Sequence, residues 1–543
     1  MNLKKIYTIA LSLSMAVISV ITSYASEINL IPKPQKLEIT EGENYTITSK
    51  TTINYSEELK DLALLLSDYI YAPTGIKLET TLSSKGGKNT IQLAIDNSIE
   101  SREGYILDIT SKGVTIKAKT GAGAFYGVQT LLQLLPAQIE SEKLVNIDLT
   151  LPAVAISDQP QFEWRGVMLD VSRYFYSKDF VLRFIDMMSM YKMNTLHFHL
   201  VDDSGWRLEI KKYPLLTSIG AFAGEGENRT GGFYTQDDIK EMIKYGELRG
   251  VEIIPEIEFP AHMLSAVVAY PWLSCRDEQL KMPLQHYISK DLICVGQERS
   301  IEFLKDVLEE TFELFPSKYV HIGGDEAVYT YWESCPHCQE IMKKEGLSRA
   351  AELQAYLTNI VAEIAEKHGR TIVGWDEILE RGKVDKPVVS MIWRNINNVE
   401  HVLNSEHMAV LTPVQSAYFD MPENRLPGQI QAATWSNPIS VERCYSFETA
   451  KFEGNAKILG VQASMWSDQF INGTTLQEIS LLNENRSENY VEYLMLPRLL
   501  AMAEVCWTPN SERDFKDFDA RLSAHYTRLG CAGFNYCIPV PEV

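Results

Sequence analysis

After its first 25 residues the sequence lacks any long hydrophobic run, and it carries no excess of positive charge. A membrane-spanning helix needs about 20 consecutive apolar residues, so the rest of the chain offers no candidate for one. Lysine and arginine together number 51 against 72 aspartates and glutamates, which leaves a formal net charge of −21. Such a charge repels polyanions at long range. The composition therefore argues against stable membrane insertion of the mature chain and against nucleic acid as a partner.

Low-complexity segments and short internal repeats are also missing, and nothing marks the chain as disordered or collagen-like. With 45% hydrophobic and 23% charged residues, the composition is that of a folded protein with a large core. The 543 residues are enough for about two or three domains of roughly 100–200 residues each.

The first 25 residues have the pattern of a signal peptide. Lys4 and Lys5 form a charged start, an apolar run extends from Ile6 to Ile21, and Ser23-Tyr24-Ala25 supplies the small residues of a cleavage site. An uncleaved anchor helix is the alternative, but the apolar run is short for a span. We expect residues 1–25 to be removed and the protein to be exported, to the periplasm or the extracellular space.

Cysteine is scarce, and all eight cysteines follow residue 274. An even count in an exported chain fits disulfides, although the sequence leaves their connectivity open. Cys335-Pro336-His337-Cys338 resembles a redox dithiol, but no thioredoxin-like unit surrounds it. A structural disulfide or free thiols are the better interpretation there. We also expect a disulfide between Cys275 and Cys294, closing the loop after the third strand of the second domain.

The chain divides into two folded parts and a tail. Residues 26–158 alternate strand-like runs with turns and end in a helical run, which indicates a small α+β domain. Within it, "TGAGAFYG" is a helix-entry turn rather than a phosphate loop, because it lacks the Lys-Ser/Thr ending. Residues 159–510 alternate short apolar strands with amphipathic helices. We expect residues 511–543 to form a C-terminal helix and tail packed on this second domain.

Eight strands alternate with helices in the second domain, which predicts an α/β fold of the (β/α)₈ TIM-barrel type. Ser177 is placed to cap one helix, and Thr235 with Asp238 forms a capping-box-like pair before another. A third helix runs through Leu353 to Gly369. The expected strands are residues 163–171, 193–201, 250–259, 318–324, 370–378, 388–393, 408–413 and 458–466.

Acids and tryptophans collect where these strands end, at the face where such barrels carry their active sites. Aromatic rings and carboxylates together suit a sugar, which has apolar C–H faces and a rim of hydroxyls. Taken singly, each residue also has a structural interpretation, as core filling or as a buried ion pair. The polar and aromatic residues at the strand ends are Asp170, Arg173, His197, His199, Asp202, Asp203, Glu256, Glu258, His262, Asp325, Glu326, Trp375, Asp376, Glu377, Trp393, Arg394, Tyr418, Asp420, Trp466 and Asp468.

Seven motifs along the chain resemble, in order and spacing, those of glycoside hydrolase family 20, the β-N-acetylhexosaminidases. The resemblance covers nearly the whole mature chain, because residues from "LIPKPQKLEI" to "GAFYGVQTLLQLLP" look like the α+β domain that precedes the barrel in that family. "HIGGDE" alone is fairly specific and "GWDE" is weak. The motifs are "RGVMLDVSRYF", "LHFHLVDDSGWR", "PEIEFPAH", "HIGGDE", "GWDE", "YFD" and "GVQASMWSD".

The resemblance implies an exo-acting glycoside hydrolase that removes terminal β-linked GlcNAc or GalNAc from an oligosaccharide or glycoconjugate, without cofactor or metal. It implies a retaining, substrate-assisted reaction in which the 2-acetamido oxygen is the nucleophile and an oxazolinium ion the intermediate. Glu326 is then the general acid and base, Asp325 orients the acetamido group and Tyr418 hydrogen-bonds its oxygen. The substrate-binding residues would be Arg173, Asp202, His262, Trp375, Trp393, Asp420, Trp466 and Asp468. Glu258 would stand behind His262, and the two would support the general acid.

Three positions depart from the family pattern: Tyr174 stands where a histidine is expected, Glu258 where an aspartate is expected, and Asp468 where a glutamate is expected. The last change shortens the reach to the outer sugar hydroxyls, so the choice between GlcNAc and GalNAc stays open, as do the natural glycan and the oligomeric state.

Two other functions remain as alternatives. A metal-dependent barrel hydrolase could use His197 and His199 with a nearby acid as ligands. A sugar-binding protein without catalytic activity would account for the three departures.

Overall fold

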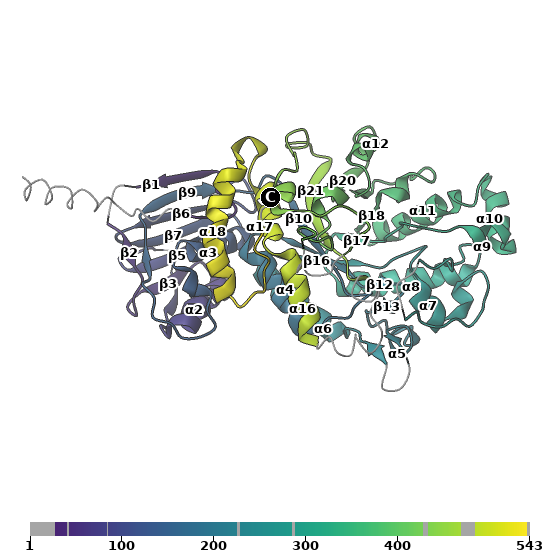
Figure 1. Ribbon diagram of the computed structural model, residues 1–543, viewed down its shortest axis with the longest axis horizontal. Helices are drawn as coiled ribbons and strands as arrows, with labels where there is room; N and C mark the ends of the chain where they lie inside the picture. The colour runs from purple at the N-terminus through teal and green to yellow at the C-terminus, as the bar shows by residue number, and fades with distance from the viewer. Residues whose placement is uncertain are drawn as a thin grey trace, which may run out of the picture.

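The structure is a computed structural model that describes residues 28–40, 43–83, 85–224, 229–284, 288–426, 433–468 and 484–539 (Figure 1). The signal peptide expected at residues 1–25 lies outside the described residues. Among the helices of the described ranges, none combines the length and the apolar character that crossing a membrane requires.

The N-terminal domain is a seven-stranded mixed sheet with the order β1-β9-β6-β7-β5-β3-β4. Helices α2 (Lys60–Thr74) and α3 (Gly121–Gln133) pack on the sheet. The side chain of Thr120 accepts a hydrogen bond from the Gly123 N–H, so "TGAGAFYG" is the start of α3, as predicted. The strands are β1 (Lys36–Ile39), β3 (Thr52–Tyr55), β4 (Glu79–Leu82), β5 (Thr90–Ile95), β6 (Tyr105–Thr110), β7 (Gly113–Ala118) and β9 (Val154–Asp158).

The second domain is a closed barrel of eight parallel strands, which confirms the predicted (β/α)₈ fold. Each predicted strand window contains one barrel strand, and pairing of β10 with β21 closes the ring. The barrel strands are β10 (Trp164–Asp170), β11 (Thr195–His199), β16 (Glu252–Glu256), β17 (Tyr319–His321), β18 (Thr371–Trp375), β19 (Val389–Ile392), β20 (Met408–Leu411) and β21 (Ile458–Met465).

The barrel helices begin at the predicted caps. Ser177 accepts a hydrogen bond from the Phe180 N–H at the start of α4 (Lys178–Met190). Thr235 and Asp238 form a complete capping box at α6 (Gln236–Leu248), so two otherwise unpaired N–H groups are satisfied. Further helices are α7 (Leu264–Ala269), α8 (Glu298–Leu314), α9 (Thr330–Ser334), α10 (Pro336–Glu345), α11 (Glu352–Lys367), α12 (Val399–Leu403), α14 (Val441–Tyr445), α16 (Glu484–Met495) and α17 (Arg498–Trp507).

A buried arginine joins the two domains at the start of the barrel. Arg165 on β10 forms two hydrogen bonds, of 2.8 and 2.7 Å, with the carboxylate of Glu103 in the N-terminal domain. Its guanidinium also lies 5.1 Å from the ring centre of Trp507. A buried charge is tolerated when it is paired in this way, so the N-terminal domain is fixed at the face of the barrel opposite the strands' carboxyl ends.

The C-terminal helix α18 (Phe515–Cys531) does not pack on the barrel alone, as the sequence had suggested, but lies between the two domains (Figure 1). Arg528 donates hydrogen bonds to the carbonyls of Leu132 and Leu135 and to Glu140 in the N-terminal domain. Arg521 pairs with Glu504 on α17 of the barrel. Helical periodicity reveals a buried face but not which surface covers it, and that is why the prediction was incomplete.

The cysteines form no disulfide in the described chain, so the prediction of a bond between Cys275 and Cys294 is wrong. The Sγ atom of Cys275 lies 3.7 Å from that of Cys338, and the Sγ atom of Cys294 lies 3.7 Å from that of Cys335. The two cysteines after β16 thus meet two cysteines that follow β17, a proximity that the sequence does not reveal.

Candidate active site

Two adjacent acids, Asp325 and Glu326, face the same side of the barrel mouth. Neighbouring residues of a strand would point in opposite directions, but β17 ends before them. Gly323 and Gly324 have φ angles of 65° and 95°, and Glu326 has a φ of 50°, all in the left-handed region. The chain therefore turns between strand and acids, and a carboxylate oxygen of each lies within 4.8 Å of a nitrogen of His262.

The turn at Gly323 is fixed by Glu258, at the end of the preceding strand. A Cβ atom on Gly323 would lie 1.8 Å from the Glu258 carboxyl group, so only glycine fits. The Gly324 N–H donates a 2.9 Å hydrogen bond to Glu258 Oε1. Burial, with the charge of Asp325 added, raises the pKa of Glu258 well above its usual range. Glu258 is therefore a neutral support of the turn that carries both acids.

His262 links the acids to two further carboxylates. Its Nδ1 atom lies 3.3 Å from Asp203 Oδ2 and 3.5 Å from Asp202 Oδ1. Burial lowers the pKa of His262, but these carboxylates outweigh that effect and hold the pKa well above its usual 6.5. The imidazolium then presents its Nε2 to Asp325 and Glu326. Contrary to the sequence interpretation, Glu258 is not its partner. Asp203, in "VDD" of the second motif, was counted among the strand-end acids but was given no role in the site.

Asp325 and Glu326 differ in their exposure to solvent. The side chain of Glu326 is 40% exposed, whereas that of Asp325 is 13% exposed. Burial and the neighbouring Asp325 charge raise the pKa of Glu326 above its usual value, while His262 and Arg173 oppose that rise. A carboxyl group that keeps its proton at the mouth of a site is suited to act as a general acid.

Arg173 is the main cation of the site. Its guanidinium contacts Asp202 at 2.6 Å and Asp170 at 3.4 Å. It also lies 4.8 Å from the ring centre of Trp466. Burial lowers the pKa of Arg173, but the charges of Asp202, Asp170 and Asp468 outweigh that effect and raise the pKa above its usual value. Asp468, which stands in the last motif where a glutamate is expected, is therefore close enough for its charge to act on this guanidinium.

Aromatic rings wall the other side of the mouth. The ring of Trp375 lies 5.7 Å from that of Trp466 and 6.5 Å from that of Trp393, and Trp393 stacks on Tyr418 at 6.0 Å. Trp375 donates a 3.1 Å hydrogen bond from Nε1 to Glu256 Oε1, and Trp393 donates one of 3.0 Å to Glu377 Oε2. These bonds fix the orientation of both indoles.

The floor beside Tyr418 holds a buried acid and an exposed ring. Both carboxylate oxygens of Asp420 are buried. Burial, together with the charge of Asp468, raises the pKa of Asp420 well above its usual range. Trp435, 54% exposed, meets Tyr418 edge to face at 5.8 Å. Sequence reasoning missed Trp435, because it lies in none of the seven motifs.

The histidines considered as metal ligands are buried and contact a shared carboxylate. Glu256 contacts His197 Nε2 at 2.9 Å and His199 through Nδ1. Gln462 donates to His197 Nδ1 at 2.9 Å. Burial lowers the pKa of His197 to about 4, whereas Glu256 and Asp202 outweigh the effect of burial and raise that of His199 to about 10. The two histidines thus share Glu256 in a buried charge network beside Trp375.

The described contacts connect all the site residues expected from the sequence. His262 joins Asp202, Asp325 and Glu326, and Arg173 continues from Asp202 to Trp466 and the aromatic wall. Glu258 joins through the turn at Gly324, whereas Asp420 and Asp468 join through their charges on Tyr418 and Arg173. One side of the mouth is charged and the other aromatic, and the charged side includes Glu326, whose pKa is raised.

Two family models match the chain. "Glycosyl hydrolase family 20, domain 2" matches residues 27–159, and "Glycosyl hydrolase family 20, catalytic domain" matches residues 162–510. A curated β-hexosaminidase of Porphyromonas gingivalis is 37% identical over 530 residues, which cover 96% of this chain and 66% of the relative. The chain thus spans just under two thirds of that relative's length.

Solved structures of similar proteins cover nearly the whole chain. The family 20 β-N-acetylhexosaminidase of Streptomyces coelicolor A3(2) superposes with a TM-score of 0.81 at 30% identity, covering 95% of this chain and 98% of that one. A mutant β-hexosaminidase of Streptomyces plicatus, solved in complex with its product GlcNAc, gives a TM-score of 0.80 at 30% identity, with 94% and 97% of the two chains covered.

Proposed function

The chain belongs to glycosyl hydrolase family 20, and we propose that it is an exo-acting β-N-acetylhexosaminidase that releases terminal β-linked GlcNAc or GalNAc by a retaining, substrate-assisted reaction. The observation that carries this proposal is the placement of Asp325 and Glu326 on one side of the mouth, both facing the same nitrogen of His262.

This placement does not set the two acids on opposite sides of a glycosidic bond. Retaining enzymes with a protein nucleophile use two carboxyl groups about 5–5.5 Å apart that flank the bond, and inverting enzymes separate them by about 6.5–9.5 Å. Adjacent residues that share a histidine contact do not flank a bond. The nucleophile is then the acetamido oxygen of the substrate, a route that this family is known to use.

Glu326 donates a proton to the departing oxygen and later removes one from water. Its raised pKa favours the protonated form, and its exposed position lets it reach the bond between the terminal sugar and the next one. Once the oxazolinium ion has formed, the carboxylate of Glu326 activates the water that opens the ring.

Asp325 and Tyr418 hold the acetamido group that does the attack. Asp325 is largely buried, so its charge acts at short range on the acetamido N–H and on the positive charge that develops there. Tyr418 hydrogen-bonds the acetamido oxygen. The ring wall of Trp375, Trp393 and Trp466 surrounds the methyl group and excludes water, which would otherwise compete as the nucleophile.

The remaining polar residues bind the hydroxyls of the terminal sugar. The Nε atom of Arg173 is buried without a hydrogen-bond partner among the described residues, so it is available to a hydroxyl. Asp202 is held ionised because the Arg173 guanidinium lowers its pKa well below the usual value, against the effect of burial. Asp468 reaches the outer hydroxyls with one methylene less than a glutamate would.

The test compares nitrophenyl β-N-acetylglucosaminide, nitrophenyl β-N-acetylgalactosaminide and nitrophenyl β-glucoside as substrates. Release of nitrophenol from the two acetamido sugars and almost none from the glucoside is expected, with the β-anomer of the free sugar formed first, as monitored by NMR. Comparable turnover of the glucoside would refute substrate assistance and favour a metal-dependent hydrolase. Binding without turnover of any of them would favour a sugar-binding protein.

Export of the chain is part of the same proposal and is supported by the sequence of residues 1–25. An exported enzyme would meet glycans outside the cytoplasm. Cell fractionation of the full chain and of a variant without residues 2–25 tests this. Recovery of both forms in the cytoplasm would contradict it.

A further inference from the structure

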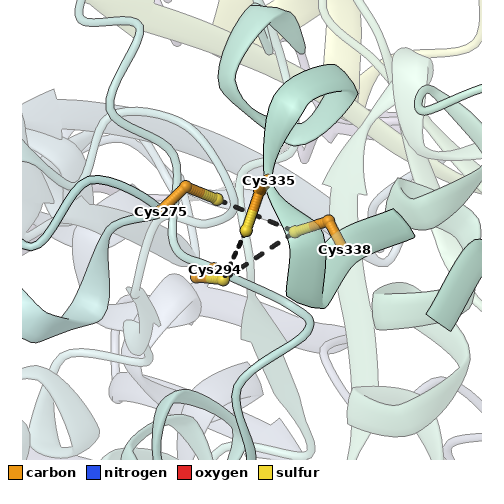
Figure 2. Close-up of side chains that lie close together, drawn as sticks. All are labelled: Cys275, Cys294, Cys335 and Cys338. Carbon is orange, nitrogen blue, oxygen red and sulfur yellow. Dashed lines mark hydrogen bonds between the residues drawn. The ribbon is translucent and has the colours of Figure 1, made fainter. Parts of the chain in front are cut away.

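Four of the eight cysteines gather in one cluster near the barrel mouth (Figure 2). Cys275 and Cys294 lie in the segment between β16 and α8, whereas Cys335 and Cys338 lie between β17 and α11. The four sulfur atoms are all within 4.8 Å of one another, and Figure 2 shows the side chains converging from different segments on a common centre. Three of the four residues are buried and Cys275 is partly buried.

The distances between the sulfurs are those of a tetrahedral metal site. Sulfur to sulfur, Cys275 to Cys338 and Cys294 to Cys335 measure 3.7 Å, and Cys294 to Cys338 measures 3.8 Å. Four thiolates at about 2.3 Å from a zinc ion stand at the corners of a tetrahedron whose edge is about 3.8 Å. Cys294 has two sulfur neighbours at this distance, whereas a disulfide joins each sulfur to one partner at about 2.05 Å.

The local backbone has features that suit thiolate ligands. Cys335 and Cys338 have the C-x₂-C spacing of zinc sites and stand at the N-cap and in the first turn of α10, where N–H groups and the helix dipole favour negative charge. Gly296 passes so close to α10 that an added Cβ would lie 2.2 Å from the carbonyl carbon of His337.

The first pair of cysteines is held in place by protein contacts alone. Ser274 and Ile293 form an isolated antiparallel bridge, so Cys275 and Cys294 follow paired positions. Arg276 bonds the Asp291 carboxylate at 2.9 and 2.8 Å across the same pair of segments. The ligand geometry is thus organised by the fold, as a structural metal site requires.

We propose that Cys275, Cys294, Cys335 and Cys338 bind one structural Zn²⁺ ion that fastens the loop after β16 to the loop after β17. These two loops carry His262 and the pair Asp325 and Glu326, respectively. The ion supplies no chemistry to the substrate, because four thiolates leave it no open position. It fixes the position of one catalytic loop against the other and keeps the four thiols from oxidation.

The first experiment measures metal content and thiol state in the full chain, produced without a histidine tag in medium that contains zinc and iron. Elemental analysis should find about one zinc per chain, and the four thiols should react with a thiol reagent only after chelation in denaturant. Exchange with Co²⁺ should give thiolate-to-cobalt charge-transfer absorption. Less than about 0.1 metal ion per chain, iron in place of zinc, or peptide mapping that shows Cys275–Cys338 and Cys294–Cys335 disulfides would overturn the proposal.

The second experiment compares variants. Cys294→Ala and Cys338→Ala should lose the zinc, whereas Cys444→Ala, at a buried thiol outside the cluster, should retain it. Zinc-depleted protein should unfold at a lower temperature than the zinc-loaded form and regain its midpoint when zinc is returned. A full zinc content in Cys338→Ala would refute the assignment. If the cluster variants fail to fold, the metal content and cobalt spectrum of the unsubstituted chain decide the question.

Discussion

The Nε2 atom of His262 lies 3.6 Å from the Oε2 atom of Glu326, across two loops that follow neighbouring barrel strands. The same nitrogen lies 3.7 Å from Oδ2 of Asp325. One cation thus opposes two carboxyl groups of unequal burial, and its charge lowers the pKa of Glu326, which burial and the Asp325 charge raise. The protonation of the general acid is therefore controlled by residues on both loops.

Replacing Glu326 with glutamine should lower kcat/KM by about 10²–10⁴-fold, because the amide retains the shape but has no proton to donate. The loss should be greatest for oligosaccharides, whose leaving group needs protonation, and smallest for nitrophenyl glycosides. Steady-state kinetics on both substrate types measures it. Glu363→Gln, at an exposed position on α11, is the control. Equal losses on the two substrate types would contradict the role of general acid.

Replacing His262 with asparagine should move the basic limb of the pH profile of kcat/KM to higher pH. The charge of His262 lowers the pKa of Glu326, so without it Glu326 keeps its proton to higher pH. Asparagine is chosen because it tolerates the left-handed φ of 52° at this position. A basic limb that stays in place, or that moves to lower pH, would show that His262 does not tune the acid.

The fold could be predicted because each barrel strand is a short apolar run followed by polar residues, and helices α4 and α6 begin at recognisable caps. The contacts between segments that are distant in the sequence could not be predicted. Nothing in the periodicity of α18 indicates that Arg528 reaches into the N-terminal domain. Likewise, the spacing of Cys275 and Cys294 suggested a local pair, whereas the fold brings them to cysteines on another loop.

The members of the site could be named from motifs, but their arrangement could not. Adjacent acids alternate on a strand, so the shared orientation of Asp325 and Glu326 requires the turn at Gly323 and Gly324. The partner of His262 was misassigned because Glu258 and Asp203 both follow strands that end at the same mouth. Only the fold shows that Asp203 faces the imidazole while Glu258 lies under Gly323.

Replacing Asp325 with asparagine should shift the basic limb of the pH profile in the opposite direction to that of His262→Asn. The Asp325 charge raises the pKa of Glu326, so its removal lets Glu326 lose its proton at lower pH. The variant should also lose much of its advantage on acetamido sugars over the corresponding glucoside, because the amide no longer stabilises the charge that develops on the acetamido nitrogen. The pH dependence of kcat/KM and the ratio of rates on the two sugars measure these effects. Shifts of the same sign in both variants would contradict the proposed pairing of charges.

Replacing Gly323 with alanine should destabilise the protein more than Gly369→Ala does, although both glycines have nearly the same φ, 65° and 68°. At Gly369 nothing lies within 4 Å of the added Cβ, so that variant reports the backbone strain alone, about 1–2 kcal/mol. At Gly323 the methyl group must also displace the Glu258 carboxyl group, which adds about 1–3 kcal/mol. Chemical denaturation of both variants measures the difference. Because the displaced turn carries Asp325 and Glu326, Gly323→Ala should also lower kcat, whereas Gly369→Ala should leave it unchanged. Equal unfolding midpoints and equal kcat values in the two variants would show that Glu258 does not set the position of the acids.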